Sequence, residues 1–296
     1  MNRDHVLDSR NAEAVRKLLA SEGANLLSLQ DFAGWTLPGM IELYSSLLAL
    51  PKQGGKIRGE IVSGEQTMLE WSQLHSTWNG DRKPALPQGA ELLPIDFFRV
   101  DSEAVVNGES FEALCFSGFQ QRLVRASKNV GFQPGYSRAL AGVMLELVEN
   151  VLQHSRVSEA GNEHALVAYH TTPNYLAFSI SDLGVGLLTS LRSSTTWAEL
   201  SSDEAALKAI VRHGASRKDG LGEGEGFKQL FKALVDRSAN IRIRTGTAAV
   251  DLGLNDEAER VAEYSSSPHL AGVQISLVCS TKEDPSERVI RKSLTK

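Results

Sequence analysis

The stretch Tyr-Leu-Ala-Phe-Ser-Ile-Ser-Asp-Leu-Gly-Val-Gly (175–186) decides the fold expected for this chain. Residues 175–181 are rich in apolar and aromatic side chains and predict a β-strand. Asp182 follows this strand, and Gly184 and Gly186 follow Asp182 at alternate positions. A carboxylate there can accept a hydrogen bond from an exocyclic amine such as adenine N6, and glycines let the backbone approach a ligand. An ordinary Asp-x-Gly turn explains the same residues, so this stretch alone leaves the function open.

The segments around this strand predict an α+β domain. A second strand is expected at 165–169, followed by the turn-forming residues Thr-Thr-Pro-Asn (171–174). Apolar spacing predicts further strands at 95–100, 240–245 and 273–279, and helices at 109–130, 137–156, 203–212 and 226–237. Ser137 is the expected N-cap of the helix 137–156. This order predicts a mixed β-sheet with helices on one face, and the polar stretch 253–271 predicts an extended loop.

The first 105 residues show a weaker pattern. Apolar spacing predicts helices at 11–22, 39–50 and 65–76 and a short strand at 56–63, with a loop at 79–89. We therefore divide the chain into two domains. We expect residues 1–105 to form a smaller α/β region of unknown fold that recognises a partner protein, and residues 106–296 to form the α+β domain.

The overall composition excludes several classes of protein. The 296 residues carry a formal charge of −5, whereas a protein that coats nucleic acid needs a broad basic surface, so nucleic acid is not indicated. Cys115 and Cys279 lie far apart, which disfavours a disulfide framework or a zinc cluster. Residues 1–20 lack the apolar core of a signal peptide, and no apolar run approaches the roughly 20 residues that span a bilayer. These features predict a soluble, cytoplasmic protein without a membrane partner.

A polar line runs along the expected helix 137–156. At about 100° per residue, Glu146, Asn150 and His154 lie within about 80° of one another. They adjoin an apolar arc made of Leu140, Met144, Leu147, Val148, Val151 and Leu152. A carboxylate at Glu146 could orient and deprotonate a water molecule, and the amide oxygen of Asn150 suits Mg²⁺. The same residues could equally face solvent.

A glycine-rich stretch preceded by basic residues predicts a phosphate site. Gly222, Gly224 and Gly226 precede an apolar helix, and free backbone N–H groups at the start of a helix attract anions. This spacing matches neither the Walker A sequence nor the dinucleotide-binding fingerprint, so an ordinary surface loop explains it equally well. In an acidic chain, the preceding basic cluster favours a polyphosphate ligand, although cations at a solvated helix end explain it too. This cluster consists of Lys208, Arg212, His213, Arg217 and Lys218.

Four stretches, in this order, resemble the GHKL ATPase superfamily. They are Glu-Leu-Val-Glu-Asn (146–150), Asp-Leu-Gly-Val-Gly (182–186), His-Gly-Ala-Ser-Arg-Lys (213–218) and Gly-Glu-Gly-Glu-Gly-Phe (222–227). The superfamily includes gyrase-type topoisomerases, mismatch-repair ATPases, histidine kinases, anti-sigma serine kinases and large heat-shock chaperones. The resemblance covers roughly residues 110–280. It implies the Bergerat fold, a two-layer sandwich of a mixed β-sheet against helices.

The resemblance implies a role for each matching residue. Glu146 would be the general base, Asn150 the magnesium ligand, and Asp182 the adenine contact beside Gly184 and Gly186. The other nucleotide contacts would be Ser216, Lys218, Gly222, Gly224, Gly226 and Phe227. Two departures stand out. Phe227 stands where the superfamily usually has leucine, and Val273 follows Gly272 where a threonine is usual, which weakens any threonine contact near the nucleotide.

The expected function is Mg²⁺-dependent ATP hydrolysis, or ATP-gated switching, that regulates a partner protein. A serine/threonine kinase of the anti-sigma type and a nucleotide sensor without hydrolysis stay open as alternatives, and a homodimer is compatible with each. A histidine autokinase is disfavoured because Ser76, not an acidic residue, follows His75. A hydrolase triad of His154, Ser155 and Asp182 is disfavoured because no G-x-S-x-G sequence presents the serine.

Overall fold

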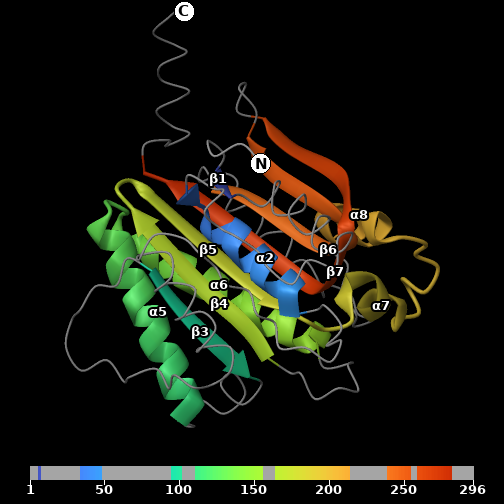
Figure 1. Cartoon of the computed structure of the whole chain (residues 1–296), viewed down its shortest axis with the longest axis horizontal. Helices are drawn as coiled ribbons and strands as arrows, with labels where there is room; N and C mark the ends of the chain where they lie inside the picture. The colour runs from blue at the N-terminus through green and yellow to red at the C-terminus, as the bar shows by residue number, and fades with distance from the viewer. Residues whose placement is uncertain are drawn as a thin grey trace, which may run out of the picture.

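The structure is a computed structural model that describes residues 6–7, 34–48, 95–101, 111–155, 164–213, 239–254 and 259–281 (Figure 1). Its centre is a five-stranded sheet in the order β3-β4-β5-β7-β6. These strands are β3 (Ile95–Asp101), β4 (His164–Thr172), β5 (Tyr175–Asp182), β7 (Arg260–Ser280) and β6 (Ala239–Leu254). A separate parallel pair joins β1 (Val6–Leu7) to β2 (Gly34–Trp35). The expected α+β class is confirmed.

The expected mixed sheet is wrong, because every neighbouring pair in the five-stranded sheet is antiparallel. Strands β4 and β5 form a hairpin in which Thr172 pairs with Tyr175, leaving Pro173 and Asn174 as the turn. Asn174 has a φ of 68°, in the left-handed region that asparagine tolerates better than most residues. A turn this short can only return the chain antiparallel, since parallel neighbours need a long crossover.

The expected loop at 253–271 is also wrong, because most of it is β-strand. Strand β6 continues to Leu254, and pairing with β7 runs from Ala239↔Cys279 to Leu254↔Arg260, with register shifts around Gly246. We call the part of β6 and β7 beyond these shifts, residues 248–254 and 260–270, the outer arm. Several of its residues between 262 and 269 are exposed. An antiparallel strand can keep a face in water while its backbone groups are paired, so a polar sequence does not exclude a strand.

Four helices cover one face of the sheet and enclose the main hydrophobic core. They are α5 (Phe111–Asn129), α6 (Pro134–Ser155), α7 (Gly186–Arg192) and α8 (Asp203–His213). Phe119 of α5 packs on Tyr169 of β4, with ring centroids 5.4 Å apart. Helix α6 begins at Pro134 rather than after Ser137, and proline is favoured at a first helical position because its missing N–H would be unpaired there. The short helix α7 was not predicted.

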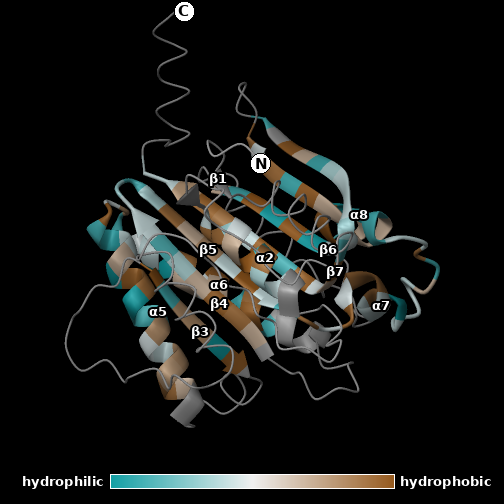
Figure 2. Ribbon diagram, viewed as in Figure 1, coloured by the Kyte–Doolittle hydropathy of each residue, from teal (hydrophilic) through white to brown (hydrophobic). Residues whose placement is uncertain are grey.

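A fifth helix, α2 (Leu37–Leu48), which belongs to the N-terminal region, lies on the opposite face of the sheet. Successive strand residues point to opposite faces. Phe178 and Ile180 of β5 belong to the core with α5 and α6, whereas Ser181 contacts Ser45 of α2. Figure 1 shows α2 in front of the sheet and α6 behind it, and Figure 2 shows hydrophobic and polar residues alternating along the strands between them.

Two elements before the predicted boundary at residues 105 and 106 contact the sheet. Strand β3 pairs with β4 from Ile95↔His170 to Asp101↔His164, and α2 packs on β5 and β7. The division into two domains stays a prediction. The helices expected at 11–22, 65–76 and 226–237 and the strand expected at 56–63 lie outside the described residues.

Candidate functional site

Asp182 ends β5 and is buried, with 1% of its surface exposed. Its Oδ1 accepts a hydrogen bond from the Gly184 amide at 2.5 Å, and its Oδ2 accepts one from the Val273 amide of β7 at 3.1 Å. A carboxylate offers about four lone-pair sites, and no other described residue donates a hydrogen bond to this one. Asp182 therefore keeps acceptor capacity for a ligand.

Two glycines allow the backbone to pack closely around Asp182 and Thr245. Gly272 has a φ of +73°, and a Cβ there would lie 2.6 Å from Asp182 Oδ1 and still closer to the Asp182 carbonyl oxygen. Gly186, at the start of α7, has a φ of +77°, and its Cβ would lie 3.0 Å from Thr245 Oγ1. The backbone of β7 can approach Asp182 this closely only because Gly272 lacks a side chain, and α7 can approach Thr245 only because Gly186 lacks one.

Thr245 of β6 is a residue of this site that sequence reasoning missed. Its hydroxyl donates to the Gly272 carbonyl oxygen at 3.1 Å and accepts from the Leu187 amide at 3.0 Å. It therefore ties the start of α7 to β7 beside Asp182. Its position in the expected strand 240–245 was the only sequence signal, and a strand pattern does not say which strands become neighbours. We define the Asp182 site as Asp182, Gly184, Gly186, Thr245, Gly272 and Val273.

Burial raises the pKa of Asp182 from 3.8 to about 7, and the hydrogen bonds from the Gly184 and Val273 amides counter this rise only in part. Removing a carboxylate from water disfavours its charged form. At neutral pH Asp182 is therefore divided between a carboxylate and a neutral acid.

The raised pKa predicts how stability changes with pH. Because its pKa is higher in the folded state, Asp182 binds its proton more tightly there than in the unfolded chain. The resulting stability is fully present below pH 3.8 and is lost as the pH rises through about 7. Between pH 5 and pH 7 the free energy of unfolding should fall by about 2 kcal/mol from this group. Chemical denaturation of wild type and Asp182→Asn across this range measures it. The Asn variant should show a flatter profile, and parallel profiles would contradict the prediction.

The helix α6 holds Glu146 at the protein surface. Leu140, Met144, Leu147 and Val148 are buried as the apolar arc predicted, while Glu146 is exposed. No hydrogen bond or ion pair joins Glu146 to the Asp182 site among the described residues. The side chain of Asn150 lies outside the described residues, so its role as magnesium ligand stays a prediction.

Six of the expected nucleotide contacts lie outside the described residues, so the structure does not test them. They are Ser216, Lys218, Gly222, Gly224, Gly226 and Phe227. Of the expected site residues, the structure brings together Asp182, Gly184 and Gly186.

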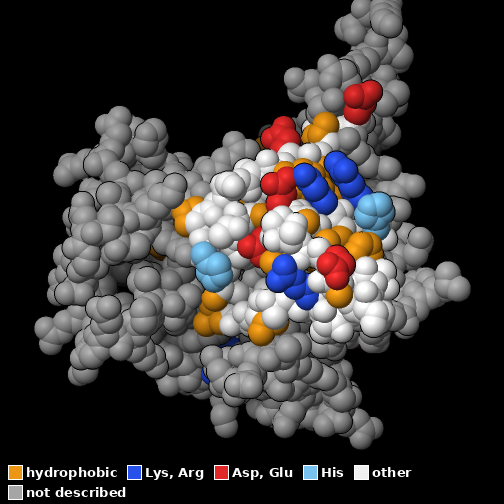
Figure 3. Space-filling model, turned by 90° about the vertical axis from the view of Figure 1, so that its right-hand side faces the viewer, with side chains coloured by type: hydrophobic (Ala, Val, Ile, Leu, Met, Phe, Trp, Pro, Cys, Tyr) orange, Lys and Arg blue, Asp and Glu red, His pale blue; other side chains and the backbone are white. Residues whose placement is uncertain are grey.

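Two members of the expected basic cluster have partners within the protein. Lys208 forms an ion pair with Glu204 and lies 5.3 Å from the ring centroid of Tyr264. Arg212 lies close enough to Tyr264 for its positive charge to counter in part the rise that burial causes in the pKa of the Tyr264 hydroxyl. Figure 3 shows the face that carries α7 and α8, on which basic and acidic side chains are interspersed. Lys208 and Arg212 thus lie beside Tyr264 of β7, while His213 stacks on Trp197 with ring centroids 6.3 Å apart.

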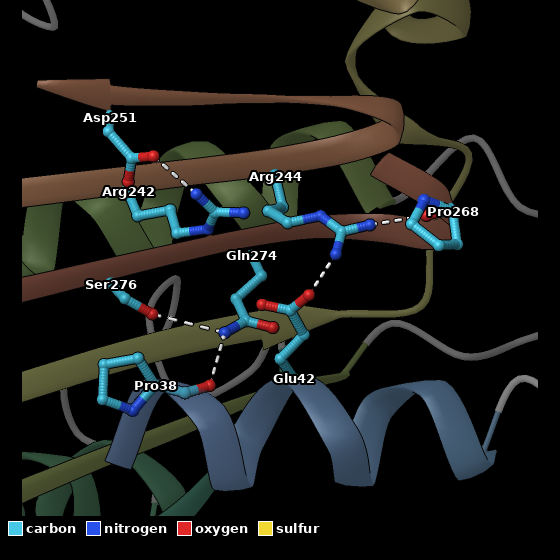
Figure 4. Close-up of polar contacts among 8 residues, drawn as sticks. All are labelled: Pro38, Glu42, Arg242, Arg244, Asp251, Pro268, Gln274 and Ser276. Carbon is cyan, nitrogen blue, oxygen red and sulfur yellow. Dashed lines mark hydrogen bonds and ion pairs between the residues drawn. The ribbon is translucent and has the colours of Figure 1, made fainter. Parts of the chain in front are cut away.

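The opposite face of the sheet carries a buried polar layer under α2 (Figure 4). Arg244 of β6 forms a buried ion pair with Glu42 of α2 and donates to the Pro268 carbonyl oxygen at 2.6 Å. On the same strand, Arg242 pairs with Asp251 at 2.6 Å. Burying a charge is tolerable only where it is paired, so this layer fixes the position of α2.

Helix α2 also bonds to residues adjacent to the Asp182 site. Ser45 and Ser181 share a hydrogen bond of 2.8 Å between their hydroxyls. Gln274 donates from Nε2 to the Pro38 carbonyl oxygen at 3.1 Å. Ser181 precedes Asp182, and Gln274 follows Val273. A shift of α2 would therefore act on the two strands that position Asp182.

The described residues contain no group of three or more His, Cys, Asp or Glu side chains arranged to hold a metal ion. None of the described helices combines the length and the apolar character needed to cross a membrane. Comparison with protein-family models and with curated proteins found no match to this chain.

Proposed function

We propose that this chain binds ATP at the Asp182 site and uses the bound nucleotide to regulate a partner protein. The observation that carries this proposal is a buried carboxylate at a strand end that keeps acceptor capacity, with Gly272 and Gly186 beside it. Adenine presents an exocyclic amine next to a ring nitrogen, and a buried acceptor discriminates strongly in favour of such a donor. The ordered resemblance of the four sequence stretches to GHKL ATPases supports the same ligand.

The contacts of α2 support regulation by the bound nucleotide. Helix α2 belongs to the N-terminal region expected to recognise a partner. It forms hydrogen bonds with Ser181, which precedes Asp182, and with Gln274, which follows Val273. A ligand shifts a conformational equilibrium only through different contacts in the two states. Nucleotide at the Asp182 site would change the environment of the two strands on which α2 rests, so the N-terminal region would sense occupancy.

Hydrolysis is the more specific form of this proposal. Glu146 would orient and deprotonate the attacking water, and Asn150 would hold Mg²⁺, whose chemistry is to neutralise charge on the transferred phosphate. Glu146 is exposed and therefore open to a ligand and to water. The alternative of a nucleotide sensor without turnover requires only the Asp182 site.

Binding is tested with the full chain by isothermal titration of ATP in the presence of Mg²⁺, for wild type and Asp182→Asn. Asparagine offers one acceptor oxygen where the carboxylate offers two, so the amine of adenine or one backbone amide loses its partner. We expect the dissociation constant to rise by about 10- to 100-fold. Asp251→Asn, which alters an aspartate on the outer arm of β6, should leave it unchanged. Equal affinity of wild type and Asp182→Asn would sink the proposal.

Turnover separates the hydrolase from the sensor. Phosphate release should be lost in Glu146→Ala while ATP binding is retained, because Glu146 would act on the water and not on adenine. If wild type binds ATP and releases no phosphate, the sensor stands and hydrolysis is wrong. Transfer of labelled phosphate to a co-purifying protein would instead identify the kinase.

A further inference from the structure

A groove of about 440 Å³ runs between the outer faces of α5 and α6, away from the Asp182 site. Three of its lining residues are cations, Arg125 and Lys128 on α5 and Arg138 on α6. None of its lining residues is acidic. In a chain with a formal charge of −5, this gathering of positive charge is a local feature of one surface.

These three cations differ from the other described Lys and Arg side chains. Arg122, Lys208, Arg242 and Arg244 each form an ion pair with a carboxylate. In the described part of the chain, no ion pair or hydrogen bond occupies the side chains of Arg125, Lys128 or Arg138. Their charge is therefore available to a ligand.

Small residues on α6 leave the helix backbone accessible on that side of the groove. Ala141 and Gly142 line it, and a Cβ added at Gly142 would meet no atom within 4 Å. Glycine within a helix is unfavourable by about 0.5–1 kcal/mol relative to alanine, so the helix gains nothing from Gly142. An open strip of backbone flanked by cations suits the close approach of another chain.

The α5 side presents a continuous exposed stripe. Leu114, Ser117, Gln121, Arg125 and Lys128 are separated by three or four residues, so they share one helix face, and all are exposed. Leu114, with 51% of its surface exposed, is one of two large exposed hydrophobic residues in the described part of the chain. The stripe runs over about 21 Å, from an apolar end to a cationic end.

We propose that this groove binds an acidic amphipathic helix of a partner protein. The carboxylates of that helix pair with Arg125, Lys128 and Arg138, and an apolar side chain at its other end covers Leu114. An amphipathic helix is a common occupant of a groove between helices, and the three cations select a helix whose facing side chains are acidic. A nucleic acid would need more phosphate contacts than three cations provide, and it would not use Leu114. The proposal does not depend on ATP binding.

The test is fluorescence anisotropy with the full chain and a labelled helical peptide about 18 residues long. The peptide carries Glu residues one turn apart at one end and Leu on the same face at the other. Wild type should bind it, and binding should weaken as salt is raised, because exposed charges are screened. A peptide with Gln for Glu and a scrambled peptide of the same composition should each bind at least about tenfold more weakly.

Two pairs of variants test whether the peptide binds in the groove. Arg125→Glu/Lys128→Glu should weaken binding at least about tenfold, whereas Arg125→Lys/Arg138→Lys keeps the charge and should retain it. Gly142→Leu fills the groove and should weaken binding, whereas Gly142→Ala should retain it. Leucine and alanine both favour a helix more than glycine does, so each variant should fold, and circular dichroism checks this.

Several outcomes would overturn the proposal. One is no binding of the acidic peptide by folded wild type. Another is equal binding of the scrambled peptide, and a third is unchanged binding by the charge-reversed and groove-filled variants. Tighter binding of a single-stranded RNA oligonucleotide, lost in the charge-reversed variant, would assign the groove to nucleic acid instead.

Discussion

Replacing Glu42 with Ala should lower the free energy of unfolding by about 3–5 kcal/mol. The Glu42 and Arg244 side chains are 3% and 1% exposed and form an ion pair between α2 and β6 (Figure 4). Removing the carboxylate leaves the guanidinium buried beside α2 without its counter-charge, and this desolvated charge is the main cost. Urea denaturation followed by circular dichroism measures the change.

A matched pair at the surface is the control for this prediction. Lys208 and Glu204 also form an ion pair, but their side chains are 41% and 48% exposed. Glu204→Ala should therefore cost no more than about 0.5 kcal/mol. The double variant Glu42→Leu/Arg244→Met removes both buried charges and should recover much of the loss. Equal effects of Glu42→Ala and Glu204→Ala would contradict the buried position of α2 on the sheet.

Replacing Gly272 with Ala should lower the free energy of unfolding by about 3–5 kcal/mol, from strain and overpacking together. The new Cβ would lie 2.6 Å from Asp182 Oδ1 and closer still to the Asp182 carbonyl oxygen. That oxygen belongs to backbone held in place by β4 and β7, so it cannot move aside cheaply. The φ of +73° adds strain for any residue with a side chain.

Gly142→Ala is the matched control, because its Cβ points into open space on an exposed helix face. This variant should gain about 0.5–1 kcal/mol through helix propensity. Thermal and urea denaturation of both variants measure the difference. If the free energy of unfolding of Gly272→Ala lies within about 0.5 kcal/mol of the wild-type value, β5 and β7 do not approach each other at Asp182 as described.

Local patterns in the chain were enough to predict most elements on which the site depends. The strand 175–181, its partner at 165–169 and the helices at 109–130 and 203–212 are present within a few residues of their expected bounds. Each has a strong apolar period, which is the signal that identifies an element without its neighbours. The position of Asp182 at the end of a buried strand was predicted in the same way.

Features that depend on pairing could not be predicted from the same patterns. Residues 260–269 of β7 resemble a loop because they are mostly polar, yet their backbone pairs with a largely buried stretch of β6, from Ala248↔Ser266 to Leu254↔Arg260. Thr245 reaches Gly272 only through the order β5-β7-β6, which brings residues 27 positions apart into contact. Helix α2 has the apolar residues of any buried helix, and nothing in them names the face it covers.

The sequence by itself determined the α+β class, the strand that ends at Asp182, and the positions of Gly184 and Gly186 after it, because each follows from residues close together in the chain. Only the tertiary structure decided that the sheet is antiparallel, that α2 covers its second face, and that Thr245 and Gly272 complete the Asp182 site. The tertiary structure also brings Arg125, Lys128 and Arg138, which have no ion-pair partner among the described residues, to one groove. These features join distant segments, and the free energy that selects them comes from burial and pairing between elements, which no local pattern contains.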